Sequence, residues 1–299
     1  MSTAPAQPVT FLKGHGTEND FVIIPDPEGR LALDAATVAR LCDRRAGIGG
    51  DGLLRVVRSA ADPEARGMAD RAEWFMDYRN ADGSIAEMCG NGVRVFARHL
   101  RRAGLVKGDG TAVATRAGVK RVRFTGPEDG GTVEVDMGTA VLPAGPDPSV
   151  TVTVDGREWP ARHVDMGNPH AVAFVERLAD AGRLLDAPAV GPATAYPRGT
   201  NVEFVVDRGP RHVALRVHER GSGETRSCGT GACAVMVAAA RRDGLDPVRD
   251  GRPVTYTVDV PGGTLRVTET EDGTVLLAGP AVIVAEGVID PALLAPPSA

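Results

Sequence analysis

Two stretches of the sequence decide the fold, CGNGVRVFARHL at residues 89–100 and CGTGACAVMVAA at residues 228–239. When they are aligned on their first cysteines, apolar residues fall at the same four positions, 4, 7, 8 and 11 residues after each cysteine. This spacing places the apolar residues on one face of a helix. The repeat therefore predicts two related halves, each with a cysteine at the start of a buried helix.

A second echo supports the same duplication, because GTENDFV at residues 16–22 is similar to GTNVEFV at residues 199–205. Most other segments are typical of short strands, for example residues 53–57 and 74–78, and turn signals near residues 207–210 and 271–273 predict hairpins. Asp34 is expected to cap a short helix over residues 35–42. Many strands with few helices indicate an α+β fold rather than a doubly wound sheet.

Composition excludes several classes of protein. The 299 residues carry a net charge of −5, so the chain lacks the basic footprint of a nucleic-acid-binding protein. No apolar stretch reaches the roughly 20 residues of a membrane helix, and the N-terminus has no signal-peptide pattern. We therefore expect a cytoplasmic protein with neither nucleic acid nor membrane as a partner. The 37 glycines and 22 prolines indicate many turns.

Cys89 and Cys228 are the candidate catalytic residues. The first turn of a helix offers free N–H groups and a positive dipole end, which suit an anion and stabilise a thiolate. Two activated thiols can remove a proton from one face of a carbon and return a proton to the opposite face. The pattern favours a racemase or epimerase acting beside a carboxylate. The alternatives are two buried small residues, or a redox protein, although the C-x-x-C spacing of disulfide oxidoreductases is missing.

Polar residues within three positions of a glycine or proline form a second candidate set. A single asparagine at such a position is more often a turn residue. Together with a neighbouring glutamate and arginine, however, four asparagines would suit a ligand that carries both a carboxylate and an ammonium group. The set consists of Asn19, Asn80, Asn168, Asn201, Glu219 and Arg220.

Other motifs carry less weight. GIGGDG at residues 47–52 follows a predicted helix and precedes a strand, the reverse of a dinucleotide-binding loop. The six histidines show no metal-binding spacing; His99 is expected on a solvated helix face, and only His170 is a candidate for the site. Cys42 and Cys233 are expected in the core. The three lysines lie in no motif that suggests a pyridoxal cofactor.

The chain resembles the diaminopimelate epimerase family. The resemblance runs through GHGTENDFV (14–22), DRRAGIGGDGLL (43–54), YRNADGSIAEMCGNGVRVFARHL (78–100), VDMGNPHAV (164–172), RGTNVEFV (198–205) and HERGSGETRSCGTGA (218–232). It implies cofactor-independent interconversion of LL- and meso-diaminopimelate, a step of lysine and peptidoglycan precursor synthesis, with Cys89 and Cys228 as the acid/base pair. The reacting carboxylate would lie at Gly90–Asn91 and Gly229–Thr230. The distal amino-acid head would contact Asn19, Asn80, Asn168, Asn201, Glu219 and Arg220.

The resemblance also implies an architecture of two pseudo-symmetric domains, each a curved mixed sheet or barrel around a central helix. The first would comprise residues 1–127 and 278–299, the second residues 128–277, and the chain would form a homodimer. This sequence has Gly52 where many members have Gln, and Thr230 where many have Ser. Proline racemases and hydroxyproline epimerases also pair two cysteines, but proline has no distal head to occupy the second polar set.

Overall fold

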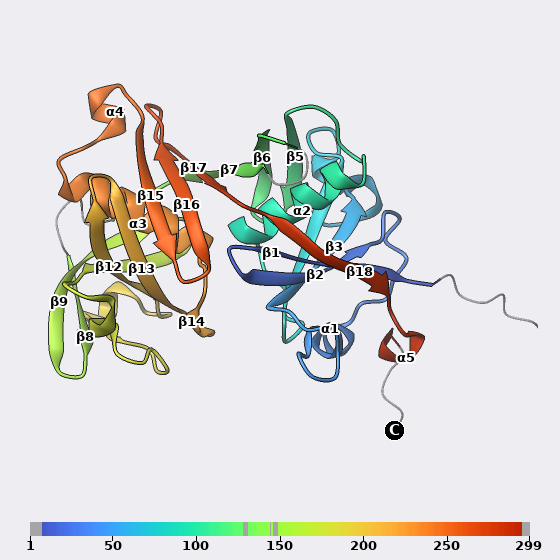
Figure 1. Cartoon of the computed structure of the whole chain (residues 1–299), viewed down its shortest axis with the longest axis horizontal. Coiled ribbons are helices and arrows are strands. Elements are labelled where there is room, and N and C mark those ends of the chain that lie inside the picture. Colours follow the sequence, from blue (N-terminus) through green and yellow to red (C-terminus); the bar gives the residue numbers. More distant parts are fainter. Residues whose placement is uncertain (1–7, 128–130, 144, 146–148, 295–299) are drawn as a thin grey trace, which may run out of the picture. The chain divides into compact units, whose positions relative to one another are not determined.

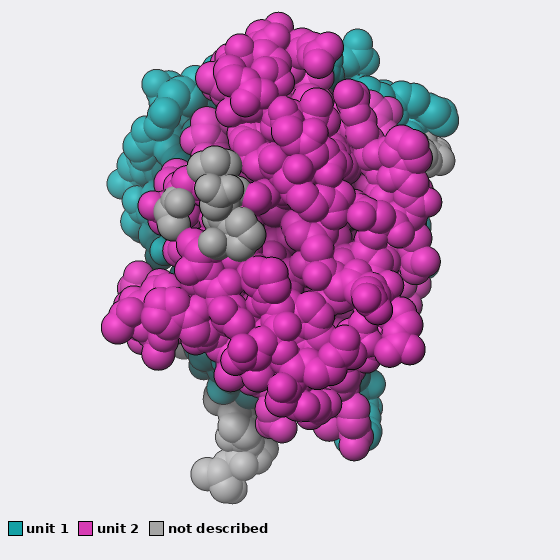
Figure 2. All heavy atoms as spheres, turned by 90° about the vertical axis from the view of Figure 1, so that its left-hand side faces the viewer, with its two compact units in different colours: residues 1–16, 20–133, 281–299 teal, residues 17–19, 134–280 magenta. Residues whose placement is uncertain are grey.

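The computed structural model describes residues 8–127, 131–143, 145 and 149–294. The N-terminal residues 1–7, examined above for a signal peptide, lie outside this range, as do residues 128–130 beside the expected boundary at 127/128. The chain divides into two compact units (Figure 2). Unit 1 comprises residues 1–16, 20–133 and 281–299, and unit 2 comprises residues 17–19 and 134–280.

Unit 1 is built from seven described strands and three described α-helices. They are β1 (Thr10–Gly16), β2 (Asn19–Pro25), α1 (Ala35–Cys42), β3 (Gly52–Arg58), β4 (Trp74–Asn80), α2 (Gly90–Arg102), β5 (Gly110–Thr115), β6 (Gly118–Thr125), β18 (Val282–Val288) and α5 (Pro291–Leu294). Strand pairing runs β18–β1–β2–β3–β4–β5–β6. The last strand of the chain thus pairs with the first, antiparallel.

Unit 2 contains the remaining described strands and two α-helices. They are β7 (Thr132–Thr139), β8 (Val150–Val154), β9 (Arg157–Asp165), β10 (Pro169–Phe174), β11 (Ala189–Gly191), β12 (Asn201–Gly209), β13 (His212–Glu219), β14 (Gly223–Thr225), α3 (Gly229–Arg242), α4 (Pro247–Asp250), β15 (Val254–Val260), β16 (Gly263–Glu269) and β17 (Thr274–Gly279). Its main run of paired strands is β9–β10–β12–β13–β15–β16–β17.

The two units share one pattern of strand pairing. In unit 1, β2–β3 is parallel, β3–β4 antiparallel, β4–β5 parallel and β5–β6 antiparallel. In unit 2, β10–β12, β12–β13, β13–β15 and β15–β16 repeat that order. Helix α2 follows β4 just as α3 follows β13, and strands of each unit curl around its helix (Figure 1). The predicted α+β fold with two related halves is confirmed.

The second sequence echo proved misleading. GTENDFV leads into β2, whereas GTNVEFV leads into β12, and the strand equivalent to β12 by pairing is β3 rather than β2. The segment of unit 2 that is equivalent to GTENDFV is therefore MGNPHAV, which leads into β10 and forms its first residues. Glycine and asparagine are common in any turn that leads into a strand, so the similar residues of the two segments do not mark equivalent positions.

The prediction for His99 was wrong, because His99 is 5% exposed. Strands β1, β3, β4, β5 and β18 all pack on α2, so its polar face is buried as well. Arg98, on the same helix, donates hydrogen bonds to the backbone carbonyls of Ala281 and Gly131, which lie far away in sequence. Burial, together with the charge of Arg102, lowers the pKa of His99 to about 4.

Helix α1 and the loop after it match their predictions. The Asp34 side chain accepts a hydrogen bond from the Thr37 N–H at 2.7 Å and caps the helix at residue 35. In the GIGGDG loop, the N–H groups of Ile48 and Gly49 donate to the Leu41 carbonyl at 2.9 and 3.0 Å. The loop therefore closes the end of a helix and leads into β3, so its glycines serve a turn.

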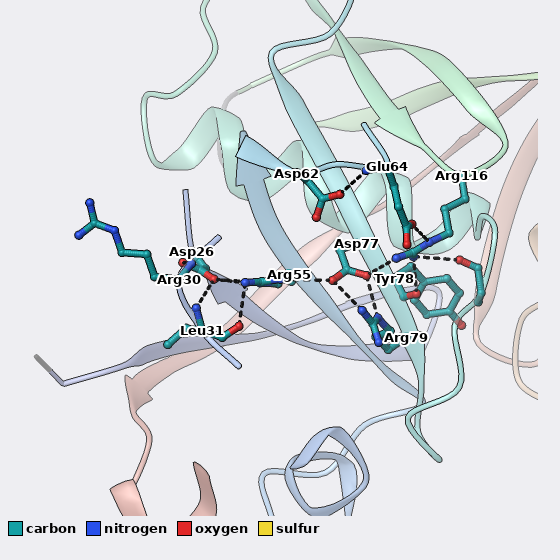
Figure 3. Close-up of polar contacts among 11 residues, drawn as sticks. Asp26, Arg30, Leu31, Arg55, Asp62, Glu64, Asp77, Tyr78, Arg79 and Arg116 are labelled. Carbon is teal, nitrogen blue, oxygen red and sulfur yellow. Dashed lines mark hydrogen bonds and ion pairs between the residues drawn. The ribbon is translucent and has the colours of Figure 1, made fainter. Parts of the chain in front are cut away.

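A buried chain of ion pairs crosses unit 1 (Figure 3). Asp77 in β4 is 2% exposed and accepts hydrogen bonds from Arg79 at 2.8 Å and Arg116 at 2.7 Å. Arg55 in β3 lies 3.8 Å from the same carboxylate and donates to Asp26. Although burial alone would raise the pKa of Asp77, hydrogen bonds from Arg79 and Arg116 hold it below its usual value.

Replacing Asp77 with Asn should lower the free energy of unfolding by about 3–5 kcal/mol, because buried arginines lose their counter-charge. Since its pKa is lowered by folding, Asp77 stabilises the wild type above about pH 4, and this stabilisation is lost as the pH falls further. Urea unfolding measured from pH 7 to pH 3 checks both points. Asp70→Asn, at an exposed position, is the control, and an equal loss in both variants would contradict the account.

Candidate functional site

Both candidate cysteines cap their helices in the same way. Cys89 precedes α2, and its sulfur accepts a hydrogen bond from the Gly92 N–H at 3.4 Å. Cys228 precedes α3, and its sulfur accepts from the Gly231 N–H at 3.3 Å. Cys89 is partly buried and Cys228 is 6% exposed. Each thiol thus lies where the first N–H groups of a buried helix point.

Close packing explains the second glycine of each C-G-x-G motif. A Cβ atom on Gly92 would lie 3.3 Å from the Leu54 side chain and 3.4 Å from the Cβ of Cys89. A Cβ atom on Gly231 would lie only 2.8 Å from Glu203 Oε1 and 3.3 Å from the Cys228 sulfur. Glycine at these positions therefore makes room for the side chains behind each thiol.

Strand register pairs the candidate residues of one half with those of the other. The parallel ladder between β2 and β3 begins with Phe21 opposite Gly52, and the equivalent ladder between β10 and β12 begins with His170 opposite Asn201. Phe21 is therefore equivalent to His170, and Gly52 is equivalent to Asn201. Gly52 in turn pairs with Asn80. In unit 2, Val202 pairs with His218 in an antiparallel ladder. The neighbouring Asn201 therefore lies opposite Glu219, as Gly52 lies opposite Asn80. The equivalent positions are therefore Asn19 and Asn168, Gly52 and Asn201, Asn80 and Glu219, and Cys89 and Cys228.

Several predicted residues of unit 2 lie together. Asn201 donates to the Pro169 carbonyl at 3.1 Å and accepts from the Arg220 N–H at 2.9 Å. The Arg220 guanidinium is exposed and donates to the Arg198 carbonyl at 3.3 Å. Asn201 thus joins the MGNPH and ERGSGE motifs. Asn19 begins β2 and is counted with unit 2, where Thr17 Oγ1 lies 2.6 Å from Ser227 Oγ beside Cys228.

A series of hydrogen bonds leads from the core to Cys228. Glu203 Oε1 lies 2.6 Å from His170 Nδ1, and both side chains are fully buried. His170 Nε2 lies 3.1 Å from Asn168 Oδ1, and the Asn168 amide donates to Thr230 Oγ1 at 3.3 Å. Thr230 Oγ1 lies 3.5 Å from the Cys228 sulfur. His170 is therefore linked to the thiol.

The surroundings of Cys228 act against its thiolate form. Burial raises the pKa of this thiol well above its usual value, and the carboxylates of Glu219 and Glu203 raise it further. Hydrogen bonds from Thr230 and the Gly231 N–H oppose this without overcoming it. Burial also raises the pKa of Glu219, although its hydrogen bonds with Thr225 and Cys228 favour the carboxylate. The surroundings of Cys228 therefore favour its thiol form over the thiolate.

The predicted residues of unit 1 lie at the ends of strands and at the start of α2. Asn80 ends β4 and donates to the Ser84 hydroxyl at 2.9 Å within its own turn. Asn91 is fully buried in the first turn of α2, beside Gly90. The other two cysteines are core residues as predicted, since Cys42 is 3% exposed and Cys233 fully buried. Burial raises the pKa of Cys42 to about 11.

Sequence reasoning missed Glu203, the buried glutamate of β12. In VEFVV it occupies an ordinary alternating position, where a glutamate would normally face solvent. No sequence signal marked it, because only the strand register of the structure shows that its counterpart in β3 is the apolar Leu54. Reasoning from the motifs alone also gave Glu219 a ligand-binding role and overlooked its hydrogen bond with Cys228.

Among the described residues, no helix is long and apolar enough to cross a membrane. The diaminopimelate epimerase family model matches residues 11–143 and 162–284. The diaminopimelate epimerase of Streptomyces coelicolor is 70% identical over 286 residues, covering 96% of this chain and 97% of that protein. The diaminopimelate epimerase of Thermobifida fusca is 51% identical over 282 residues, covering 93% and 96%.

Solved structures of low identity share the fold. A hydroxyproline epimerase from Agrobacterium vitis has a TM-score of 0.67 at 16% identity, covering 98% of this chain and 96% of that one. A Bacillus anthracis phenazine biosynthesis protein of the PhzF family has a TM-score of 0.66 at 15% identity, covering 95% and 99%.

Replacing Glu219 with Gln should lower the pKa of the Cys228 thiol, because a carboxylate charge that opposes the thiolate is removed. The rate of iodoacetamide alkylation at Cys228, measured against pH with peptide mapping, gives this pKa. Glu224→Gln is a suitable control, since Glu224 pairs with Arg216 instead. An unchanged or higher alkylation midpoint in Glu219→Gln would show that Glu219 does not act on this thiol.

Proposed function

The chain belongs to the diaminopimelate epimerase family, and from this membership we infer that it is an isomerase that epimerises diaminopimelate in lysine biosynthesis. We propose that the reaction interconverts LL- and meso-2,6-diaminopimelate without a cofactor. Cys89 and Cys228 act as the acid/base pair. The observation that carries this proposal is the repeated cap, in which a thiol at the start of each central helix accepts the N–H of the glycine three residues later.

The proposed reaction moves one proton at each face of the α-carbon. One cysteine, as the thiolate, takes the α-hydrogen as a proton, and the electron pair left behind spreads into the adjacent carboxylate. The other cysteine, as the thiol, gives its proton to the opposite face of the same carbon. The raised pKa of Cys228 is consistent with its starting as the thiol. Both thiols must reach one α-carbon when the substrate is bound.

The helix starts supply the stabilisation that this carbanion needs. The N–H groups of Gly90 and Asn91 and of Gly229 and Thr230 would bind the reacting carboxylate, where charge grows in the transition state. Thr230 keeps this backbone N–H although many relatives have Ser.

The distal amino-acid head would be held by the predicted polar residues. Arg220 would pair with the distal carboxylate, Glu219 would accept from the ammonium group, and the four asparagines would supply amide contacts. Asn201 supports this role, because its hydrogen bond to the Arg220 N–H fixes the backbone beside both charged residues. Proline lacks this distal head, so the same set disfavours a proline racemase.

We also propose that the protein works in the cytoplasm as a homodimer. Strand β18 pairs antiparallel with β1. It leaves Val282, Val284 and Val288 between 41% and 60% exposed on one face. A strand with exposed valines on one face is a surface that a second copy of the chain could cover.

Deuterium exchange at the α-carbon tests the reaction and the substrate together. In D₂O, the wild type should exchange the α-hydrogen of diaminopimelate but not of proline or lysine. Cys89→Ala and Cys228→Ala should each lower epimerisation at least about 1000-fold, because each removes one of two groups that act as a unit. Retention of the wild-type rate by either folded variant would refute the two-base assignment. Cys42→Ala, which removes a core cysteine, should keep the activity.

Val284→Lys should separate the proposed dimer, because a charge would be buried at the interface. Light scattering should then change from twice the 31.1 kDa chain mass to a single chain mass. Val248→Lys is the matched control, because Val248 is also an exposed valine, 57% exposed, and lies on α4. A wild-type monomer, or a Val284→Lys dimer, would contradict the proposal.

A further inference from the structure

The internal duplication exposes one difference between the surroundings of the two thiols. Strand register makes Phe21 the counterpart of His170 and Leu54 the counterpart of Glu203. Phe21 and Leu54 pack against Gly92, whose N–H donates to the Cys89 sulfur. At the same place in unit 2, the fully buried Glu203 packs against Gly231, and His170 is bonded to Glu203. The same fold thus has an apolar pair behind one thiol and an ionisable pair behind the other.

The polar pair is not needed for the fold, since unit 1 forms the same strand pairing with apolar side chains. Burying an ionisable pair is also costly, and apolar residues of similar volume are often as stable or more so. Glu203 adds to this cost, because in the part of the chain that the structure describes its Oε2 atom has no hydrogen-bond partner. A role outside stability would account for keeping the pair.

The contacts fix which group donates in each hydrogen bond from His170 to Cys228. An amide oxygen can only accept, so His170 Nε2, at 3.1 Å from Asn168 Oδ1, must carry a hydrogen. The Asn168 amide nitrogen then donates to Thr230 Oγ1. With a lone pair used in this way, the Thr230 hydroxyl can direct its own hydrogen to the Cys228 sulfur, 3.5 Å away. The series therefore delivers a donor to the thiolate form of Cys228.

Glu203 sets this direction. The buried pair of His170 and Glu203 has no net charge when it holds two acidic hydrogens. One lies in the hydrogen bond between Nδ1 and Oε1, and the other is on Nε2. A neutral imidazole without the carboxylate can carry its hydrogen on either nitrogen. With a bare Nε2 atom, Asn168 would offer its NH₂ group to the ring, and its oxygen would draw the Thr230 hydroxyl away from the sulfur.

We propose that Glu203 is a positioning residue that acts through His170, Asn168 and Thr230 to aim a hydrogen-bond donor at Cys228. No equivalent pair stands behind Cys89, so the two thiols are not interchangeable. This inference rests on the proposed function only in giving Cys228 an acid/base role. The hydrogen-bond series itself can be tested without the reaction.

Other titratable groups near Cys228 and His170 bear on the test. Cys228 faces Glu219 from β13 and Glu203 from β12. His170 faces Glu203 and, at longer range, His163 on the neighbouring strand β9. The Tyr196 hydroxyl donates to the His170 carbonyl at 3.3 Å. Because the Glu203 charge also disfavours the Cys228 thiolate directly, a single Glu203 variant mixes two effects of opposite sign.

A double-mutant cycle separates these effects. In a Cys89→Ala background, the alkylation rate of Cys228 by iodoacetamide is measured against pH for Glu203→Gln, Thr230→Val and the double variant. Loss of charge alone should speed alkylation equally with Thr or Val at position 230. The proposal predicts that Glu203→Gln speeds Cys228 alkylation by a factor roughly 3-fold or more greater when residue 230 is Val than when it is Thr. With Thr230, the substitution also removes the directed donor, which slows alkylation and offsets part of the gain. Equal ratios would overturn it.

Two further variants guard the result. Glu269→Gln removes another buried carboxylate of unit 2, one paired with Arg241, and should leave the Cys228 alkylation profile unchanged. The double variant His170→Phe with Glu203→Leu copies the pair of unit 1 and should fold with an equal or higher Tm. In it, Thr230→Val should alter Cys228 alkylation less than in the parent. An undiminished effect of Thr230→Val there, or a Glu269→Gln profile like that of Glu203→Gln, would refute the proposal.

These readouts do not depend on turnover. If Cys228→Ala kept the epimerase activity, the proposed function would fail while the alkylation cycle still reported on the hydrogen-bond series. If the cycle showed equal ratios while both cysteine variants were inactive, the two-base reaction would stand and the role of Glu203 would fall.

Discussion

A helix that begins inside a protein leaves its first N–H groups without backbone partners, and in this chain a cysteine sulfur meets that need twice. Cys89 and Cys228 accept from Gly92 and Gly231 at 3.4 and 3.3 Å, and strands of each unit curl around the helix that follows. In the proposed reaction, the same geometry that satisfies the helix start would offer its remaining N–H groups to a carboxylate. A structural requirement of the fold and a requirement of carbanion chemistry would thus be met by one motif.

The two copies of this motif have diverged in what stands behind them. Apolar Phe21 and Leu54 correspond to His170 and Glu203, so the half that holds Cys228 contains the buried charge. Asn80 and Glu219 differ in the same sense, since a neutral amide corresponds to a carboxylate bonded to Cys228. In the proposed reaction one cysteine takes a proton as the thiolate while the other gives its own as the thiol, so each turnover would start with the two thiols in different protonation states. The duplicated fold supplies equal positions, and these substitutions make them unequal.

Sequence patterns predicted the parts of this account that depend on local physics. The Asp34 cap, the apolar faces after both cysteines and the GIGGDG turn follow from spacing within one or two helical turns. Interactions between distant segments were beyond such patterns. The burial of His99 depends on strands that cover every side of α2, and the bond between Glu203 and His170 depends on β10 and β12 lying side by side. The raised pKa of Cys228 likewise comes from burial and two carboxylates that no helix-start rule includes. The similarity of GTENDFV to GTNVEFV was misleading, because the two segments lead into strands that are not equivalent by their pairing.

The central claim is that two different groups serve the two faces of one α-carbon, and isotope uptake in the first turnovers tests it most directly. With LL-diaminopimelate in D₂O, stopped at a few per cent conversion, product and recovered substrate are separated and their α-deuterium measured. The account predicts deuterium in nearly all of the product and almost none in the recovered substrate, because the base that removes the hydrogen does not return it to the opposite face. Product that keeps the original α-hydrogen, or substrate labelled as fast as product, would show that one base serves both faces.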